Sequence, residues 1–129
     1  MADQAPGASG RLGRARSDSL RHHDLCFGCG QANLFGLQLE LARTGAGVEG
    51  RFFVKQDHQG PDGNAHPGVL AAALEEALTH AGAPPAGRLE LELLEPAPVG
   101  TFVRVSAQAG AAAEALAEDG RLLATARRD

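Results

Sequence analysis

The sequence predicts an α+β domain in which an antiparallel sheet packs against one buried helix. Two observations lead to this fold class. Residues 66 to 82 carry helix start and stop signals, and the first turns between them are apolar on every side. The stretches before and after alternate between apolar and polar residues and are separated by short turns, as in antiparallel strands. The predicted order is two strands, the helix, and three or four more strands.

The ends of the predicted helix are well marked. His66 stands at the cap, and Pro67 suits the first helical position because no N–H bond is needed there. Gly82, which is soon followed by two prolines, ends the helix. Residues 69 to 74 are apolar throughout, so we expect the helix to be buried. Its alanines leave room for another element to approach closely.

The second half of the helix carries two acids. At 100° per residue, Glu75 and Glu76 share an arc with Thr79 and His80, opposite the leucines. The helix N-terminus follows a polar, glycine-bearing loop, residues 56 to 65. Such an N-terminus presents unpaired N–H groups that suit an anion or a polarised carbonyl.

The predicted strands are residues 37 to 41, 48 to 54, 89 to 93, 102 to 107 and 122 to 126. Residues 111 to 117, Ala-Ala-Ala-Glu-Ala-Leu-Ala, favour helix by propensity. Because this segment lies between two strands with short breaks on both sides, its position predicts a strand. The sheet therefore has five or six strands.

Length and composition limit the possible classes. A chain of 129 residues is long enough for one domain. It has no Trp or Tyr and only 4% aromatic residues, so the core is thin and burial through oligomerisation is expected. A net charge of -4 argues against nucleic acid as partner. The sequence has no run of 18 apolar residues, so no membrane span is predicted.

Residues 1 to 20 have no periodicity and predict a disordered tail before a single domain at 21 to 129. A basic arm for nucleic acid is the alternative for this tail. The tail lacks the apolar core of a signal peptide. Together with the two cysteines, this predicts a cytoplasmic protein.

Cys26 and Cys29 are spaced as in a zinc knuckle, and His22 or His23 would complete a ligand set. A zinc-binding domain is therefore one open alternative. A full site usually shows a second ligand pair downstream, however, and the chain has no further cysteines. The alternatives are a redox pair and a tight turn with two small thiols, and we predict the turn and no metal site.

Four segments resemble the phenylacetate-pathway (PaaI-like) group of acyl-CoA thioesterases. They are residues 26 to 37, Cys-Phe-Gly-Cys-Gly through Gly-Leu; residues 58 to 70, with His-Gln-Gly and His-Pro-Gly-Val-Leu; residues 95 to 100, Glu-Pro-Ala-Pro-Val-Gly; and residues 119 to 126, Asp-Gly-Arg-Leu-Leu-Ala-Thr-Ala. The resemblance implies a hotdog fold, in which the sheet wraps the central helix. It also implies a homodimer or homotetramer with sites at the subunit interface.

The resemblance implies hydrolysis of an acyl-CoA or aryl-CoA, with the CoA thioester as substrate and no cofactor. Similar thioesterases use an acid nine residues after the loop histidine, and here that acid is Glu75, as nucleophile or general base. We predict a structural role for Glu76. The predicted substrate-binding residues are His58, Gln59, Asn64, His66, Gly68 and Val69. Arg51, Arg88 and Arg104 are candidates for the CoA phosphates by charge alone.

The sequence departs from the family pattern at Pro67. The family has a glycine there, and its N–H points at the thioester carbonyl, whereas proline has no N–H. Loss of one such donor costs about 2.7–4 kcal/mol in transition-state stabilisation. Either the amides of Gly68 and Val69 replace it, or the chain is a non-catalytic hotdog module that binds acyl-CoA.

Overall fold

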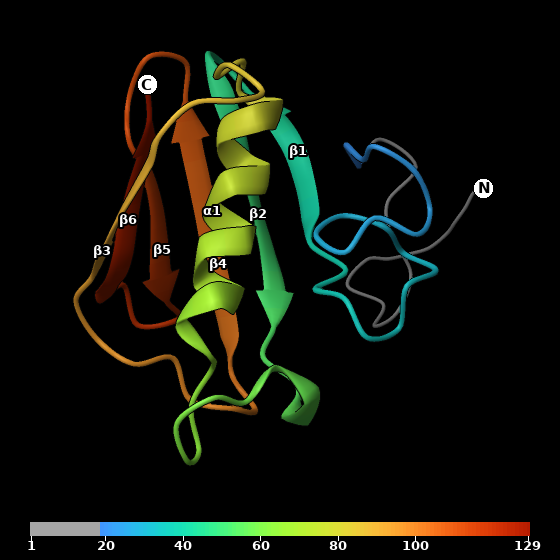
Figure 1. The fold of residues 1–129 in the computed structure, drawn as a ribbon, viewed down its shortest axis with the longest axis vertical. Helices are drawn as coiled ribbons and strands as arrows, with labels where there is room; N and C mark the ends of the chain where they lie inside the picture. The colour runs from blue at the N-terminus through green and yellow to red at the C-terminus, as the bar shows by residue number, and fades with distance from the viewer. Residues whose placement is uncertain (1–18) are drawn as a thin grey trace.

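The computed structural model describes residues 19–129, and in this part of the chain one helix covers one face of a six-stranded antiparallel sheet (Figure 1). The elements are β1 Glu40–Thr44, β2 Gly47–Phe53, the short 3-10 helix η1 Gln56–His58, α1 Pro67–His80, β3 Leu89–Leu93, β4 Phe102–Gln108, β5 Ala113–Ala117 and β6 Leu122–Arg128. The strand order is β1-β2-β4-β5-β6-β3. The predicted fold class is confirmed.

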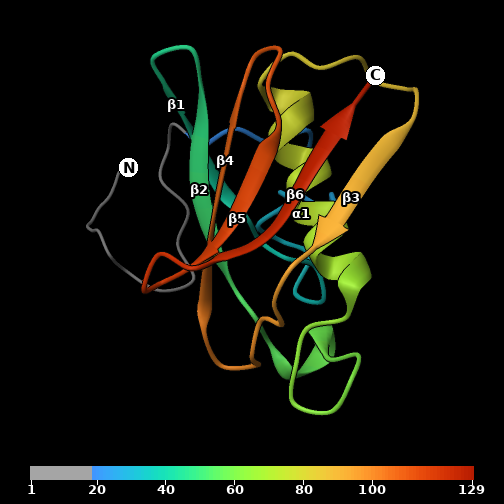
Figure 2. The same ribbon diagram turned by 90° about the vertical axis from the view of Figure 1, so that its left-hand side faces the viewer.

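The core lies between α1 and the inner face of the sheet (Figure 2). β4 and β5 alternate as expected, and in β5 the buried positions are Ala113, Ala115 and Ala117. Small side chains on both surfaces let the helix lie close to the sheet. The predicted strand at 111 to 117 is therefore confirmed as β5, in spite of its helical propensity.

The first predicted strand was placed too early. Leu37, Leu39 and Leu41 are buried as the alternation predicts, but β1 begins only at Glu40. Gln38 has a positive φ of 50°, and the amides of Leu37 and Leu39 donate to the carbonyls of Phe27 and Gly28. Residues 37 to 39 thus pair with the N-terminal loop, which a pattern of alternation does not reveal.

The predicted tail at 1 to 20 lies almost wholly outside the described residues. Leu20 is described, and its amide donates to the carbonyl of Leu41 at 2.8 Å, beside the edge strand β1. Among residues 19–129, the opposite edge of the sheet is β3, which pairs only with β6. In residues 19–129, no helix is both long and apolar enough to cross a membrane.

Gly50 is a position where the sheet requires glycine. A Cβ at Gly50 would overlap the carbonyl oxygen of Glu40 in the neighbouring strand β1. We therefore expect Gly50→Ala to lower the free energy of unfolding by about 1–3 kcal/mol, as overpacking does. Urea unfolding measures this change. The control is Glu49→Ala, an exposed neighbour in β2, for which we expect a change within about 0.5 kcal/mol. Equal effects in both variants would contradict the steric argument.

Candidate functional site

A hollow of about 270 Å³ lies beside the N-terminus of α1. Pro67 and Leu70 of the helix form one wall, and Asn64 from the preceding loop lies next to them. Leu93 and Leu94, at the end of the edge strand β3, form another wall and are about half exposed. The hollow thus joins the predicted helix start to an open edge of the sheet.

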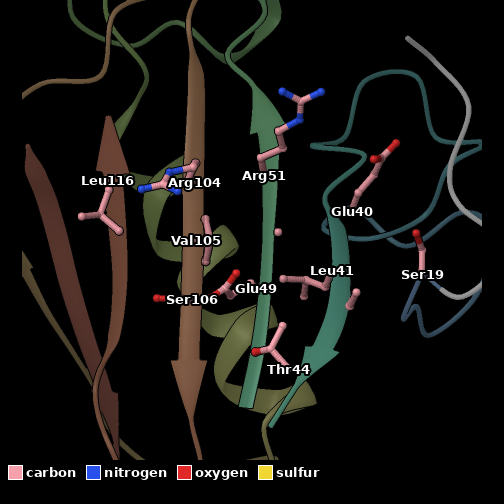
Figure 3. A pocket seen from close by; sticks show the side chains of 12 residues that line it. Ser19, Glu40, Leu41, Thr44, Glu49, Arg51, Arg104, Val105, Ser106 and Leu116 are labelled. Atoms are coloured by element: carbon pink, nitrogen blue, oxygen red, sulfur yellow. The ribbon is translucent and has the colours of Figure 1, made fainter. Parts of the chain in front are cut away.

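A larger hollow of about 350 Å³ lies on the face of the sheet turned away from α1 (Figure 3). Its lining includes Arg51 and Arg104, which stand opposite each other on β2 and β4. Two of the three arginines considered for the CoA phosphates are therefore far from the helix start. Arg88 is exposed and pairs with Asp129 at 3.8 Å. The smaller hollow is the candidate site because it lies at the helix start, although Asn64 is the one predicted site residue in its lining.

The amides at the start of the helix are bonded to the cap residue. The N–H of Gly68 donates to His66 Nδ1 at 2.8 Å, so this nitrogen carries no proton. The N–H of Val69 donates to the carbonyl of His66, also at 2.8 Å. Pro67 has no backbone N–H group. Gly68 and His66 are exposed, whereas Val69 is buried, so Gly68 is the amide that a ligand can reach.

The two predicted loop amides stabilise the loop. Gln59 Oε1 accepts from the N–H of Gly63 at 2.6 Å, and Asn64 Nδ2 donates to the carbonyl of Asp62 at 3.3 Å. Asn64 lines the hollow beside the helix and Gln59 does not. Of these two residues, only Asn64 is therefore kept in the candidate site.

His58 lies in the interior, with 2% of its surface exposed. Its Nδ1 accepts from the N–H of Lys55 at 3.1 Å, which leaves Nε2 to donate to the carbonyl of Gly36 at 3.1 Å. Burial, helped by the Lys55 ammonium, holds the pKa of His58 below its usual value of 6.5. Because both ring nitrogens are bonded within the fold, neither is available to bind a substrate.

Glu75 lies on α1 and points towards β6. Its Oε2 accepts from Arg128 Nη2 at 2.9 Å and from the Thr79 hydroxyl at 2.8 Å. The side chain of Arg128 is 8% exposed and that of Glu75 is 34% exposed. The carboxylate is thus held in one orientation by a cation and a hydroxyl, while part of it remains accessible. A general base or a nucleophile needs such an arrangement.

Glu76 points towards the N-terminal loop and is 5% exposed. Its carboxylate meets a group of possible metal ligands, namely His22, Cys26, Cys29 and His80. Burial raises the pKa of the Glu76 carboxyl, but contacts with His80, Cys29 and Cys26 act against burial and hold it below its usual value. Burial raises the pKa of the Cys29 thiol to about 12. The association of Glu76 and His80 with the two cysteines was not predicted from the sequence, although Glu76 and His80 lie on the predicted polar arc of the helix.

Comparison with solved structures identifies the architecture. A thioesterase superfamily protein matches with a TM-score of 0.63 at 24% identity, over 81% of this chain and 60% of that chain. The E. coli PaaI protein from the phenylacetic acid degradation operon matches with a TM-score of 0.64 at 17% identity, over 70% of this chain and 80% of its own. A thioesterase from Haemophilus influenzae matches with a TM-score of 0.62 at 20% identity, over 71% and 76%.

The chain has the hotdog fold. The predicted resemblance to PaaI-like proteins is confirmed at this level. The chain spans about 60% of the length of the first of these hotdog proteins. No protein-family model matches the sequence, and comparison with curated proteins gives no significant match. The activity of this hotdog chain therefore has to be argued from its own residues.

The buried His58 predicts a pH-dependent stability. Its pKa is lowered in the fold, so below pH 6.5 the unfolded chain takes up a proton that the folded chain resists. The stabilisation is complete above pH 6.5 and is lost as the pH falls towards the folded-state pKa. We expect His58→Gln to remove this part of the pH dependence, measured by urea unfolding at pH 7.5 and 5.5.

The control is His66→Gln, which changes an exposed histidine on the same loop. It should keep the acid-induced loss of stability. The same loss in His58→Gln as in the unmodified chain would contradict the assignment.

Proposed function

We propose that this chain is a thioester hydrolase that acts on an acyl-CoA or aryl-CoA. Glu75 is the base or nucleophile, and the Gly68 amide at the helix start polarises the thioester carbonyl. The observation that carries the proposal is the Glu75 carboxylate, which Arg128 and Thr79 orient on the central helix of a hotdog fold. The hollow at the helix start, with Asn64 and the half-exposed leucines beside it, would take the acyl group.

The two catalytic groups of one chain are too far apart to act on the same carbonyl. Gly68 and Glu75 are separated by seven residues of α1, which is about 10 Å along a helix axis. A reacting carbon must lie within roughly 3 Å of both the attacking group and the carbonyl donor. The site is therefore completed by a second copy, which supplies the Gly68 amide to the Glu75 of its partner.

The sheet offers an edge for this second copy. β3 pairs with β6 on one side only, and the exposed side chains of Leu93 and Leu94 lie at its end. Glu75 points towards β6, on the side of the sheet where β3 lies. Pairing of β3 with β3 of another copy would extend the sheet and cover the half-buried helix positions Ala71 and Ala72.

The proposed thioester hydrolysis requires water and Glu75 and no cofactor. Glu75 as general base takes a proton from water while the water oxygen bonds to the carbonyl carbon. The carbon–sulfur bond then breaks, and the proton passes to the CoA sulfur. If Glu75 is instead the nucleophile, its oxygen bonds to the carbonyl carbon, and the carbon–sulfur bond breaks to release the CoA thiolate and leave an anhydride. Water then hydrolyses the anhydride to the free acid and the Glu75 carboxylate, and the proton released goes to the thiolate. Arg128 holds the carboxylate in place in either route.

A second function is supported by the helix start. Pro67 supplies no N–H, and the amides of Gly68 and Val69 are both bonded to His66. A hotdog module with this cap would bind acyl-CoA without hydrolysing it. Both the hydrolase and the binding module would bind acyl-CoA, and only the hydrolase would release free CoA from it.

We expect Glu75→Gln to abolish most of the turnover, because the amide neither takes a proton nor attacks the thioester. Removal of a general base typically costs about 10²–10⁴-fold in rate. Release of free CoA from short, long and aryl acyl-CoAs measures it. The matched control is Glu114→Gln, an exposed carboxylate on β5, away from the proposed site and from the edge strand β3. Unchanged turnover in correctly folded Glu75→Gln would exclude the proposed role.

Pro67→Gly restores an N–H at the start of the helix. If the missing donor limits hydrolysis, kcat should rise, by up to about 10²–10³-fold for one oxyanion donor. A measurable kcat that does not change in this variant would show that the Gly68 amide suffices. A melting curve of each variant checks that the helix start is intact.

A further inference from the structure

The groups around Glu76 come from two distant parts of the chain. Cys26 and Cys29 belong to the N-terminal loop, and Glu76 and His80 lie on the last turns of α1. The loop reaches the helix because residue 28 is glycine, since a Cβ there would overlap the side chain of Glu76. The fold thus places both thiols directly on the helix acid.

The distances match those of a tetrahedral metal site. His22 Nδ1 lies 3.6 Å from Cys26 Sγ, 3.5 Å from Cys29 Sγ and 3.5 Å from Glu76 Oε1. Cys26 Sγ lies 3.3 Å from Glu76 Oε1. Zinc bonds of 2.0–2.3 Å give tetrahedral edges of about 3.3–3.8 Å. Four of the six distances between these ligand atoms are thus close to tetrahedral edges, and Cys29 Sγ lies within 4.8 Å of the Glu76 carboxylate.

Burial adds an independent observation. Glu76 is 5% exposed and Cys29 is fully buried. Glu76 Oε2 and His80 Nε2 lie 3.2 Å apart, yet neither has a partner in hydrogen-bond geometry among the described residues. A buried carboxylate is costly to ionise unless a cation lies beside it, and the oxygen that faces His22 and Cys26 is Oε1. The His22 side chain is 42% exposed, which gives an ion a path from solvent.

We propose that His22, Cys26, Cys29 and Glu76 bind one Zn²⁺ ion. His80 also lies in this cluster, since its ligand atom is within 4.8 Å of those of His22, Cys29 and Glu76. We assign Cys26 and not His80 to the fourth position, because a second thiolate favours zinc and the sulfur lies at edge distance from His22 Nδ1 and Glu76 Oε1. His80 then orients the second oxygen of Glu76 from outside, as second-shell groups do.

The donor set selects the kind of metal. Two thiolates with an imidazole favour zinc over Mg²⁺ and Ca²⁺, which prefer oxygen ligands. Four protein ligands leave no open position, so the site is structural and not catalytic. It would tie the N-terminal loop to α1, away from the Glu75–Arg128 pair, which contacts β6. The proposal is independent of the proposed hydrolysis, and its test does not use activity.

The full chain, kept in reductant and freed of metal with a chelator, is titrated with ZnCl₂ and with CoCl₂. We expect one equivalent of zinc to remain after gel filtration, and a tetrahedral cobalt spectrum with a thiolate charge-transfer band. Added zinc should raise the Tm. Cys26→Ser combined with Cys29→Ser should lose the zinc, the band and the rise in Tm.

Single variants keep the test valid if the double variant does not fold. Cys26→Ser and Glu76→Gln should each weaken zinc binding more than tenfold. His23→Gln is the matched control, because His23 is exposed and its ring accepts only from the amide of Leu25. It should bind zinc as the unmodified chain does. Zinc well below one equivalent in the unmodified chain, or full binding in Cys26→Ser, would overturn the proposal.

Discussion

The close contact between α1 and an inner sheet surface built largely of alanine is the constraint on which the structure depends. One helix of 14 residues covers a face to which β2, β4, β5 and β6 all contribute. The buried positions of β5 are alanines, and so are Ala73 and Ala77 of the helix. Larger residues on either surface would separate the layers. Because the helix lies so close, polar side chains on it cannot lie between the helix and the sheet.

Glu75 and Glu76 show the effect of this constraint. They are adjacent in sequence and share the polar arc of the helix, yet a turn of about 100° per residue points them to different neighbours. Glu75 reaches Arg128 on β6, and Glu76 reaches the thiols of the N-terminal loop. One carboxylate thus lies beside an open edge where a ligand and a second copy can approach. The other lies in a closed cluster that holds the loop against the helix.

The sequence was sufficient for the parts of the fold that local rules determine. The helix from Pro67 to His80 follows from its cap, its apolar turns and its glycine stop. The strand at Ala113–Ala117 was predicted from its position between two strands. Residues 37 to 39 were misassigned because their partner is a loop far away in sequence. His58 looked like a polar loop residue, and only tertiary contacts show that both its ring nitrogens are bonded inside the fold.

The groups around the two cysteines also depend on tertiary contacts that the sequence does not reveal. Their spacing suggested metal ligands, and the chain held no second cysteine pair to support the idea. The missing groups are a glutamate and a histidine four residues apart on a helix about 50 positions later, a pattern that is common on solvated helix faces. A solvated helix face and a metal site differ in whether Glu76 is buried. Glu76 is buried because the N-terminal loop approaches it closely at Gly28, where a Cβ would overlap its side chain.

At the helix start, the His66 ring and a bound ligand compete for the Gly68 amide. The His66 ring caps the Gly68 amide, and a side-chain cap of this kind contributes about 0.5–2 kcal/mol. A donor to a developing oxyanion contributes about 2.7–4 kcal/mol in the transition state. The oxyanion therefore competes successfully with the cap for the Gly68 amide, provided that the exposed ring turns away. In the proposed hydrolysis, Pro67 therefore removes one donor but leaves the Gly68 amide available, and the cap at His66 would lower the rate without preventing the reaction.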